Sequence, residues 1–392
     1  MYKYLYVVAL IYVHEMSFAQ RATDSLNSSM NQNSVQINGY QRILQNLEAV
    51  PNGMTFGGYA EVLYNQPKGA NGDIDVQRLI LLFGYKFDDR TQFVTEVEYE
   101  HVKEVYVEQA FVNYSISNSL NVRAGLMLVP MGIINEYHEP TTFNGVERPS
   151  LDEQLVPTTW REIGIGLSGR SDGLSLRYQA YLFNGFLSHN GTDGLIKGMN
   201  GFRSGRQKGA QSVFRTPNLS MKLDFYGING LRLGLSGYFG KTQAADEVFD
   251  TPGSRVGLSM IGLDARYSFR KFTARGQFIT SSISDVQEYN QLTNKDLGDS
   301  MLGYYLEGAY NILPITNRQR IFVFVRYEDF DTHASVPSFT PKNLNFHRKE
   351  ITTGFSYHLA PGVVFKMDYQ RKSTVGGDLD VNQFNAGVGV WF

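Results

Sequence analysis

The chain has 392 residues, no cysteine and a formal net charge of -2 at pH 7. The lack of cysteine excludes disulfides, thiolate chemistry and Cys-ligated metals, and the charge gives no global basic signature for nucleic acid. Aromatic residues are frequent, with 24 Tyr and 26 Phe, and there are 39 glycines. The mean hydropathy is -0.27. No run of about 18 apolar residues follows the N-terminal segment, which argues against membrane-spanning helices.

The first residues have the features of an export signal. Lys3 precedes an apolar run, Tyr4–Val13, and the small residues Ser17 and Ala19 stand before Gln20 as signal peptidase requires. We therefore predict a signal peptide over residues 1–19. Residues 20–54 are polar in their first part and lack a core of their own, although an apolar trio near residue 45 could form one or two helical turns. We interpret this segment as a flexible periplasmic lead-in.

From residue 55 to the C-terminus, about sixteen segments alternate between apolar and polar residues, as tilted membrane strands do. In 73–87, for example, Leu79, Leu81 and Phe83 share one face, while Arg78 and Lys86 share the other. The last segment alternates in the same way and ends on an aromatic residue, as a strand that closes a barrel commonly does. The pattern predicts an all-β fold over residues 55–392: a transmembrane antiparallel β-barrel of about 16 strands.

One segment breaks the alternation. In Glu104–Ile116, the apolar residues Ala110, Val112 and Tyr114 set a parity that would turn Glu108 outward. A carboxylate facing lipid is costly. We therefore expect either a β-bulge there or a position above the bilayer.

The lengths of the connections assign the two ends of the barrel. Every second connection is short, as at 88–90, 117–118 and 270–271, and most of the others are long. Short periplasmic turns and long extracellular loops are the rule for outer-membrane barrels. A large soluble β-protein such as a propeller would show a blade-length repeat and a polar outer face, and the sequence has neither.

The inward parity is rich in charge of both signs. Three interpretations stay open: a transverse field across a wet pore, a track of guanidinium groups for oxyanions, or a structural network of ion pairs. The predicted pore-lining residues are Arg78, Lys86, Glu96, Glu98, Glu100, Arg123, Arg177, Lys222, Arg232, Arg266, Arg275, Arg326, Arg348 and Lys366.

Two long loops are candidates for function. Pro130–Thr159 has no strand pattern and carries four prolines; folded inward it would narrow the pore, and otherwise it would cap the barrel mouth. Its charged candidates for a constriction are Glu136, Glu139, Glu147 and Arg148. Phe186–Pro217 is basic and glycine-rich. It could funnel anions, contact lipopolysaccharide phosphates or simply be solvated.

No enzyme or metal motif is apparent. The 7 histidines are scattered, with no HExxH spacing and no pair at metal-ligand separation. We predict no catalytic residue, no metal site and no cofactor.

Four motifs resemble those of the phosphate-selective porin O/P family, in particular the versions found in Bacteroidetes. They are EVEYEH at Glu96–His101, VEQAFVNY at Val107–Tyr114, AGLMLVPMGIINEYHEP at Ala124–Pro140 and TTWREIGIGLSGR at Thr158–Arg170. The resemblance covers residue 55 to the end. It implies a sixteen-stranded barrel, usually trimeric, with a loop folded into the pore and basic residues along an anion path.

The sequence therefore predicts a porin of the bacterial outer membrane, a passive channel for small hydrophilic solutes and ions. A dedicated phosphate or polyphosphate channel, and a non-conducting barrel that acts as an envelope-complex scaffold, are the alternatives. The expected partners are outer-membrane lipid and lipopolysaccharide, the barrel-assembly machinery through the strand that ends at Phe392, two further copies in a homotrimer, and small anions or other small solutes. No nucleic acid is expected.

Overall fold

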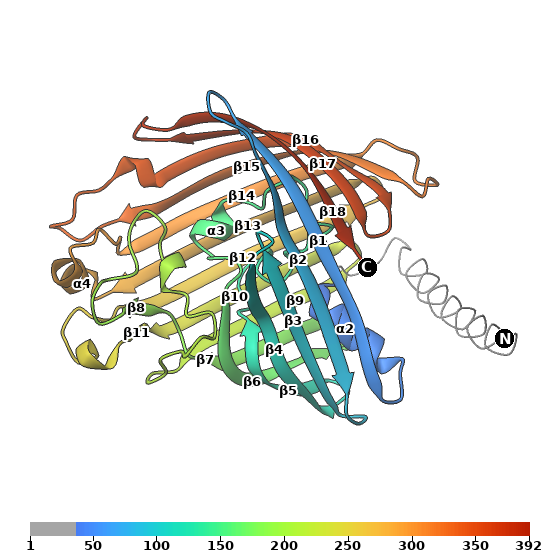
Figure 1. Cartoon of the computed structure of the whole chain (residues 1–392), viewed down its shortest axis with the longest axis horizontal. Helices are drawn as coiled ribbons and strands as arrows, with labels where there is room; N and C mark the ends of the chain where they lie inside the picture. The colour runs from blue at the N-terminus through green and yellow to red at the C-terminus, as the bar shows by residue number, and fades with distance from the viewer. Residues whose placement is uncertain (1–36) are drawn as a thin grey trace, which may run out of the picture. The chain divides into compact units, whose positions relative to one another are not determined.

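A computed structural model describes residues 37–392, and the predicted signal peptide and residues 20–36 lie outside the described part. These residues form a closed antiparallel β-barrel in which each strand pairs with its neighbours in sequence and the first strand pairs with the last (Figure 1). Within the same range, no helix combines the length and the apolar character needed to cross a membrane.

Sixteen strands of the described part make up the wall. Their bounds are β1 Gly53–Pro67, β2 Asp73–Lys86, β3 Thr91–Glu100, β4 Glu104–Ser117, β5 Leu120–Leu128, β6 Arg161–Ser171, β7 Leu176–Phe183, β9 Asn218–Ile228, β10 Leu231–Lys241, β12 Gly257–Phe269, β13 Phe272–Ser284, β14 Ser300–Asn311, β15 Arg320–Ser335, β16 His347–Ala360, β17 Val363–Thr374 and β18 Asp380–Trp391. The predicted fold class and the number of strands are therefore confirmed.

Smaller elements occupy the connections. Two short strands, β8 Leu187–His189 and β11 Gln243–Ala244, pair in parallel between two of the long loops. The helices are α2 Gly39–Glu48, α3 Leu151–Gln154 and α4 Val286–Thr293, with single 3-10 turns at Arg203–Gly205, Asp246–Val248 and Leu344–Phe346.

The C-terminal strand closes the cylinder, as its sequence predicts. β18 pairs with β1 over nine positions, from Tyr59 opposite Trp391 to Pro67 opposite Gln383. The last residue extends the ladder, because Phe392 and Gly58 exchange two backbone hydrogen bonds of 2.9 and 3.0 Å. The closed ladder leaves no strand edge exposed to lipid.

The outer wall is apolar along its length. Side chains of the predicted outward parity are exposed. Examples are Leu79 and Tyr85 on β2, and Ile165, Leu263 and Val325 on other strands. A continuous apolar outer face on a closed barrel matches the hydrocarbon of a membrane, and bacterial outer membranes are where such barrels reside. The chain is an outer-membrane protein.

The bulge expected at Glu108 is present. Glu96 of β3 lies opposite Gln109 of β4, whereas the next residue, Val97, lies opposite Val107, so Glu108 has no partner across the ladder. The extra residue shifts the parity of β4 on one side of the bulge. Glu108 is consequently fully buried inside the barrel instead of facing lipid.

The structure differs from the expectation of a flexible segment over residues 39–48. These form α2, whose start is a capping box in which Asn38 and Gln41 bond each other's backbone N–H groups. Ile43 and Leu47 are buried against Gly84 on the inner face of β2. An isolated helix of ten residues is marginal in water, so the apolar face against the wall accounts for its stability.

The inner wall behind α2 is itself apolar. Ile80, Leu82, Val94 and Phe111 point into the barrel from β2, β3 and β4, and all are buried. The sequence RLILLFGYK, Arg78–Lys86, is apolar on both parities, which is the sign of a strand that is covered on both faces. This end of the barrel is therefore packed and not simply filled with water.

Candidate functional site

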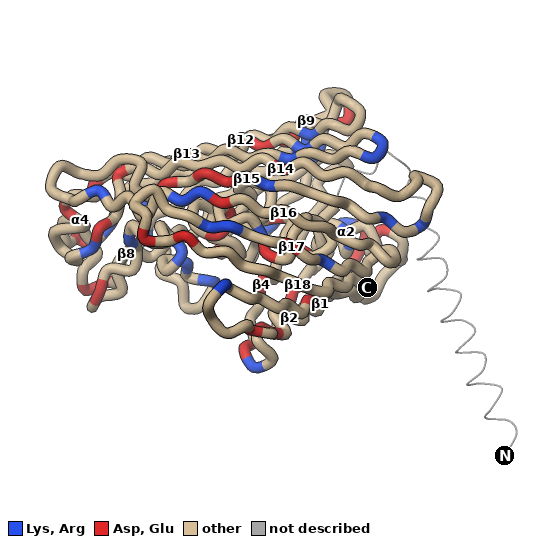
Figure 2. The backbone as a smooth tube through the Cα atoms, turned by 90° about the horizontal axis from the view of Figure 1, so that it is seen from above, with Lys and Arg blue, Asp and Glu red and all other residues tan. Residues whose placement is uncertain are grey.

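The structure places every predicted pore-lining residue on the inner side of the barrel. Arg78, Lys86, Glu96, Glu98, Lys222, Arg232, Arg326 and Lys366 are buried there, and Glu100, Arg123, Arg177, Arg266, Arg275 and Arg348 are partly buried. Basic and acidic positions are interspersed along strands such as β15, β16 and β17 (Figure 2).

Many of these charges are paired. Glu307 lies 2.8 Å from Arg275 and 3.5 Å from Arg326, and Arg326 in turn lies 2.9 Å from Glu328. Arg78 contacts Glu61 in the same manner. Buried pairs of this kind neutralise each other, and breaking one partner leaves an uncompensated charge. Of the three open interpretations, the structural network describes this part of the wall.

The arginines near the short-turn end are arranged differently. Arg232 and Arg266 stack on the ring of Tyr137 at 5.4 and 4.5 Å, and Arg177 donates to its hydroxyl at 3.4 Å. Two acids belong to the group: Asp224 lies 2.8 Å from Arg232 and 3.7 Å from Arg266, and Asp264 lies 3.9 Å from Arg266. Burial would raise the pKa of Tyr137, but the three guanidinium groups outweigh burial and lower that pKa. Three guanidinium groups face two carboxylates here, so this group has a small excess of positive charge.

The loop Pro130–Thr159 lies inside the barrel, and most of its residues are buried. Its backbone and side chains bond to the inner wall: Ile133 N–H donates to Gln277 at 2.6 Å, Val146 N–H to Asp368 at 2.6 Å, and Leu151 N–H to Glu328 at 3.0 Å. An exposed cap over the barrel mouth, the alternative interpretation, does not fit these contacts.

The four charged loop candidates do not form one cluster. Glu136 pairs with Lys222 at 3.0 Å, Glu139 accepts from the backbone of Gly39 at the start of α2, and Glu147 accepts from Asn65 at 2.8 Å. Arg148 donates to the carbonyl of His138 at 3.4 Å. The three glutamates hold the loop to β9, α2 and β1, whereas Arg148 bonds within the loop.

A cavity of about 460 Å³ remains between this loop and the inner wall of β1 to β4. Charges of both signs line it. The acids include Glu61, Glu98 and Glu100, and the bases include Arg148, Arg161, Arg203, Arg206 and Lys208. Burial, with the charges of Arg203 and Arg161 adding to it, lowers the pKa of Arg206 to about 9. The last three bases come from the basic loop Phe186–Pro217, which therefore reaches the interior.

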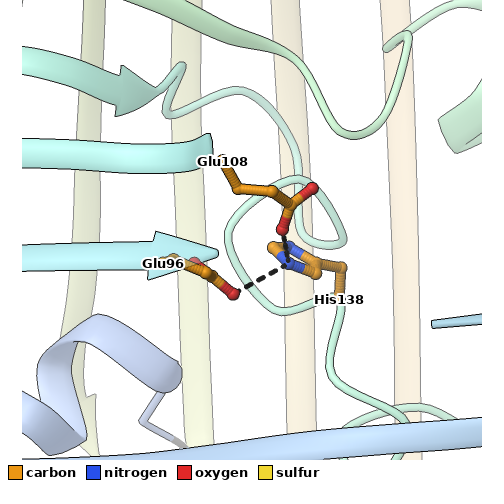
Figure 3. A group of neighbouring side chains, drawn as sticks. All are labelled: Glu96, Glu108 and His138. Atoms are coloured by element: carbon orange, nitrogen blue, oxygen red, sulfur yellow. Dashed lines mark ion pairs between the residues drawn. The ribbon is translucent and has the colours of Figure 1, made fainter. Parts of the chain in front are cut away.

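Glu96 of β3, Glu108 of β4 and His138 of the inward loop lie close together (Figure 3). His138 Nε2 lies 3.3 Å from Glu108 Oε2 and 3.9 Å from Glu96 Oε1, and all three residues are buried. Burial disfavours the charged ring, but the hydrogen bond to Glu108 and the charges of Glu108 and Glu96 raise the pKa of His138 to about 9.

Burial also governs the carboxyl of Asp152 in α3. It is fully buried and accepts from Gln277 Nε2 at 2.8 Å. Burial, aided by the charge of Glu328 and opposed by the bond from Gln277, raises the pKa of Asp152 to about 7.

Sequence reasoning missed several of these residues. Glu108 and His138 were not candidates, because the bulge in β4 and the inward course of the loop decide their positions. Arg161 was not a candidate either; it is the first residue of β6, just after the loop Pro130–Thr159, and it lines the cavity. The available signal was the broken alternation at Glu108, which marks a residue that the wall pattern cannot explain.

The chain is similar to a protein of Aquifex aeolicus (strain VF5) that is described only as uncharacterized. The two are 33% identical over 344 residues, which cover 82% of this chain and 76% of that protein. The chain belongs to the same family as the Aquifex protein. No protein-family model matches the chain.

Several solved structures have the same fold as this chain, at low sequence identity. The anion-selective porin from Comamonas acidovorans superposes with a TM-score of 0.59 and 12% identity, covering 87% of this chain and 100% of that one. The outer membrane channel DcaP of Acinetobacter baumannii gives 0.57 and 12%, covering 86% and 97%. OmpT of Vibrio cholerae, in its trimer form, gives 0.56 and 10%, covering 88% and 100%. The chain therefore has the fold of outer-membrane porins.

Proposed function

We propose that the chain is an outer-membrane porin through which small hydrophilic solutes and ions diffuse passively. The observation that carries the proposal is a closed sixteen-stranded barrel with a charged inner wall, an inward loop and a charged cavity of about 460 Å³ beside that loop. Size is filtered by the loop Pro130–Thr159, and charge by the groups that line the cavity. The similarity to porin structures in fold supports the same function.

Recording from the purified barrel in planar bilayers tests this proposal. A conducting barrel gives discrete single-channel steps, and shortening Pro130–Thr159 raises their size, since the loop occupies the interior. The matched control shortens the loop of residues 336–346 between β15 and β16. Conductance that is absent from the unaltered barrel would remove the porin proposal. Equal conductance in the two loop variants would refute the proposal that Pro130–Thr159 constricts the pore.

A phosphate or polyphosphate channel is the second candidate. Arg177, Arg232 and Arg266 around Tyr137 favour it, because guanidinium groups bind oxyanions bidentately. The four sequence motifs that resemble the phosphate-selective porin O/P family agree with it. Block of chloride current by low phosphate concentration, lost in Arg266→Gln, would favour this candidate over a general porin.

A barrel that does not conduct and serves as an envelope scaffold is the third candidate. It is favoured by the apolar packing of α2 and of the loop inside the barrel, which fills part of the interior. The same bilayer recording decides it, because a plugged scaffold gives no channel steps even after the loop is shortened.

The proposed assembly is a homotrimer in a membrane of lipid and lipopolysaccharide. A porin of the same fold, OmpT of Vibrio cholerae, has a trimer form. The strand that ends at Phe392 would be the segment read by the barrel-assembly machinery. Light scattering of the detergent-solubilised protein, corrected for bound detergent, measures the number of chains.

A further inference from the structure

We infer that Glu96, Glu108 and His138 form a site for one divalent transition-metal cation, with Zn²⁺ as the preferred ion. The three donor atoms come from β3, from the bulge of β4 and from the inward loop, and they lie within 4.8 Å of one another. A bound cation would therefore connect the loop to the wall. This inference does not depend on whether the barrel conducts.

The spacing of the donors suits such an ion. Bonds of about 2.1 Å with angles of about 90–140° place two ligand atoms about 3.0–3.9 Å apart. His138 Nε2 lies 3.3 Å from Glu108 Oε2 and 3.9 Å from Glu96 Oε1. One imidazole nitrogen with two carboxylate oxygens is a donor set that suits Zn²⁺ and Mn²⁺.

Apart from each other, at 3.3 Å, two of the donor atoms have no hydrogen-bond partner among the described residues. They are His138 Nε2 and Glu108 Oε2, each in a side chain that is at least nine-tenths buried. Buried polar atoms are nearly always satisfied, so an unsatisfied pair that faces the same point calls for an explanation. A cation between them accounts for both atoms at once.

The ring of His138 is oriented by its other nitrogen. Nδ1 lies 3.1 Å from the backbone carbonyl of Asn135, to which it can donate. Asn135 is itself fixed, because its side chain bonds the backbone of Val129 and Trp160 at 2.7 and 2.8 Å. A histidine that donates Nδ1–H to a carbonyl and presents the Nε2 lone pair has the usual arrangement of a metal ligand.

The two carboxylates are held in the same way. Tyr59 donates to Glu96 Oε1 at 3.0 Å and Gln109 donates to Glu96 Oε2 at 2.6 Å. Arg161 lies 3.5 Å from Glu108 Oε1, which leaves Oε2 directed at His138. Such outer partners fix the ligands before the ion arrives. Arg161 also lines the cavity, which offers a route for the ion.

The competing interpretation is an ion pair between a protonated His138 and the two glutamates, with no metal. Both interpretations use the same atoms, so the test must measure metal directly. The tag-free barrel, refolded in detergent with a chelator and then dialysed, is titrated with Zn²⁺ by calorimetry, and bound zinc is measured by mass spectrometry. The absence of cysteine in the chain removes thiolate sites as a source of background.

One zinc ion per chain is expected for the unaltered barrel. Glu108→Gln and His138→Gln should weaken binding by more than about 100-fold, and Tyr59→Phe by about 10-fold, as the loss of an outer partner does. The matched control is His358→Gln, which removes a different histidine of the inner wall. Zinc binding that survives both ligand substitutions, or that is absent from the unaltered barrel, would establish the ion pair instead.

A second measurement covers the case in which a variant folds poorly. Co²⁺ bound to the unaltered barrel should give visible absorption bands of a nitrogen and oxygen site, and hydrogen exchange of the loop around His138 should slow when the metal is added. Absent bands and an unchanged exchange rate would overturn the site without recourse to any substitution.

Discussion

The contact between α2 and the barrel wall yields a quantitative prediction at Gly84. A Cβ atom at this position would lie 2.4 Å from Ile43 Cγ2 and 2.9 Å from Leu47 Cδ1. Ordinary contact needs about 3.5–4.0 Å, so Gly84→Ala must push the helix away by roughly 1 Å or more. Overpacking of this kind typically costs about 1–3 kcal/mol.

The complementary change is Ile43→Ala. Ile43 is 1% exposed, and removal of a buried isoleucine side chain typically costs about 2–5 kcal/mol. The double variant removes the Cγ2 methyl that the new Cβ would strike. The two substitutions should therefore be less than additive, with a coupling of about 1–2 kcal/mol.

Amide hydrogen exchange in detergent micelles measures the docking of α2. The released helix is marginal, so exchange in the peptide that spans Tyr40–Leu47 reports opening, and each 1.4 kcal/mol is about tenfold in rate. Gly308→Ala is the control, because its new Cβ would meet only Phe272, at 3.9 Å. Strictly additive effects, or an exchange rate in Gly84→Ala equal to that of the control, would refute the packing of Ile43 into the space beside Gly84.

Three further outcomes follow from the structure. Deletion of Trp391 and Phe392 removes the backbone bonds to Gly58 that complete the ladder, and should abolish heat-modifiable, membrane-inserted barrel on gels. Asp152→Asn should flatten the pH dependence of unfolding, because burial raises the folded pKa of Asp152 to about 7, above the usual aspartate pKa of about 3.9. The stability due to the neutral acid is therefore present at low pH and declines by at most about 1.4 kcal/mol per pH unit as pH rises toward 7. Reversal potentials in a salt gradient should shift toward anions when Glu96, Glu98 and Glu100 become Gln, and toward cations when Arg123 and Arg177 do, and unchanged potentials would make these charges structural only.

The wall of the barrel could be predicted from the sequence because lipid imposes a simple rule. Every second side chain of each strand must face hydrocarbon. Apolar residues such as Leu79 and Ile165 therefore show which alternate positions face outward, and the charged positions between them are predicted to face inward. Even the exception was informative. Glu108 interrupts the alternation, and a carboxylate that faces lipid is costly. The sequence therefore predicts either a β-bulge at this residue or a position above the bilayer.

The interior could not be predicted in the same way, because its contacts join residues far apart in the chain. Glu136 pairs with Lys222, 86 residues away in the sequence, and Val146 N–H donates to Asp368, 222 residues away. No period encodes these choices. The helical tendency near Ile43 is visible in the sequence, but the site where the helix docks is not. The run Arg78–Lys86, apolar on both parities, is a signal of a covered inner face that the sequence analysis did not use.

The inner carboxylates have two different tasks, and this difference decides how charge variants are interpreted. Asp368 and Glu328 accept backbone N–H groups of the loop, so they replace the hydrogen bonds that a strandless segment lacks. Glu98 and Glu100 line the cavity, where an ion would pass within the Debye length of about 8 Å. Neutralising the first pair releases the loop and alters conductance through its shape, whereas neutralising the second alters the field alone. A change in ion selectivity without a change in the hydrogen-exchange rate of the loop is thus expected for carboxylates that act on passing ions. A change in both is expected for carboxylates that hold the loop in place.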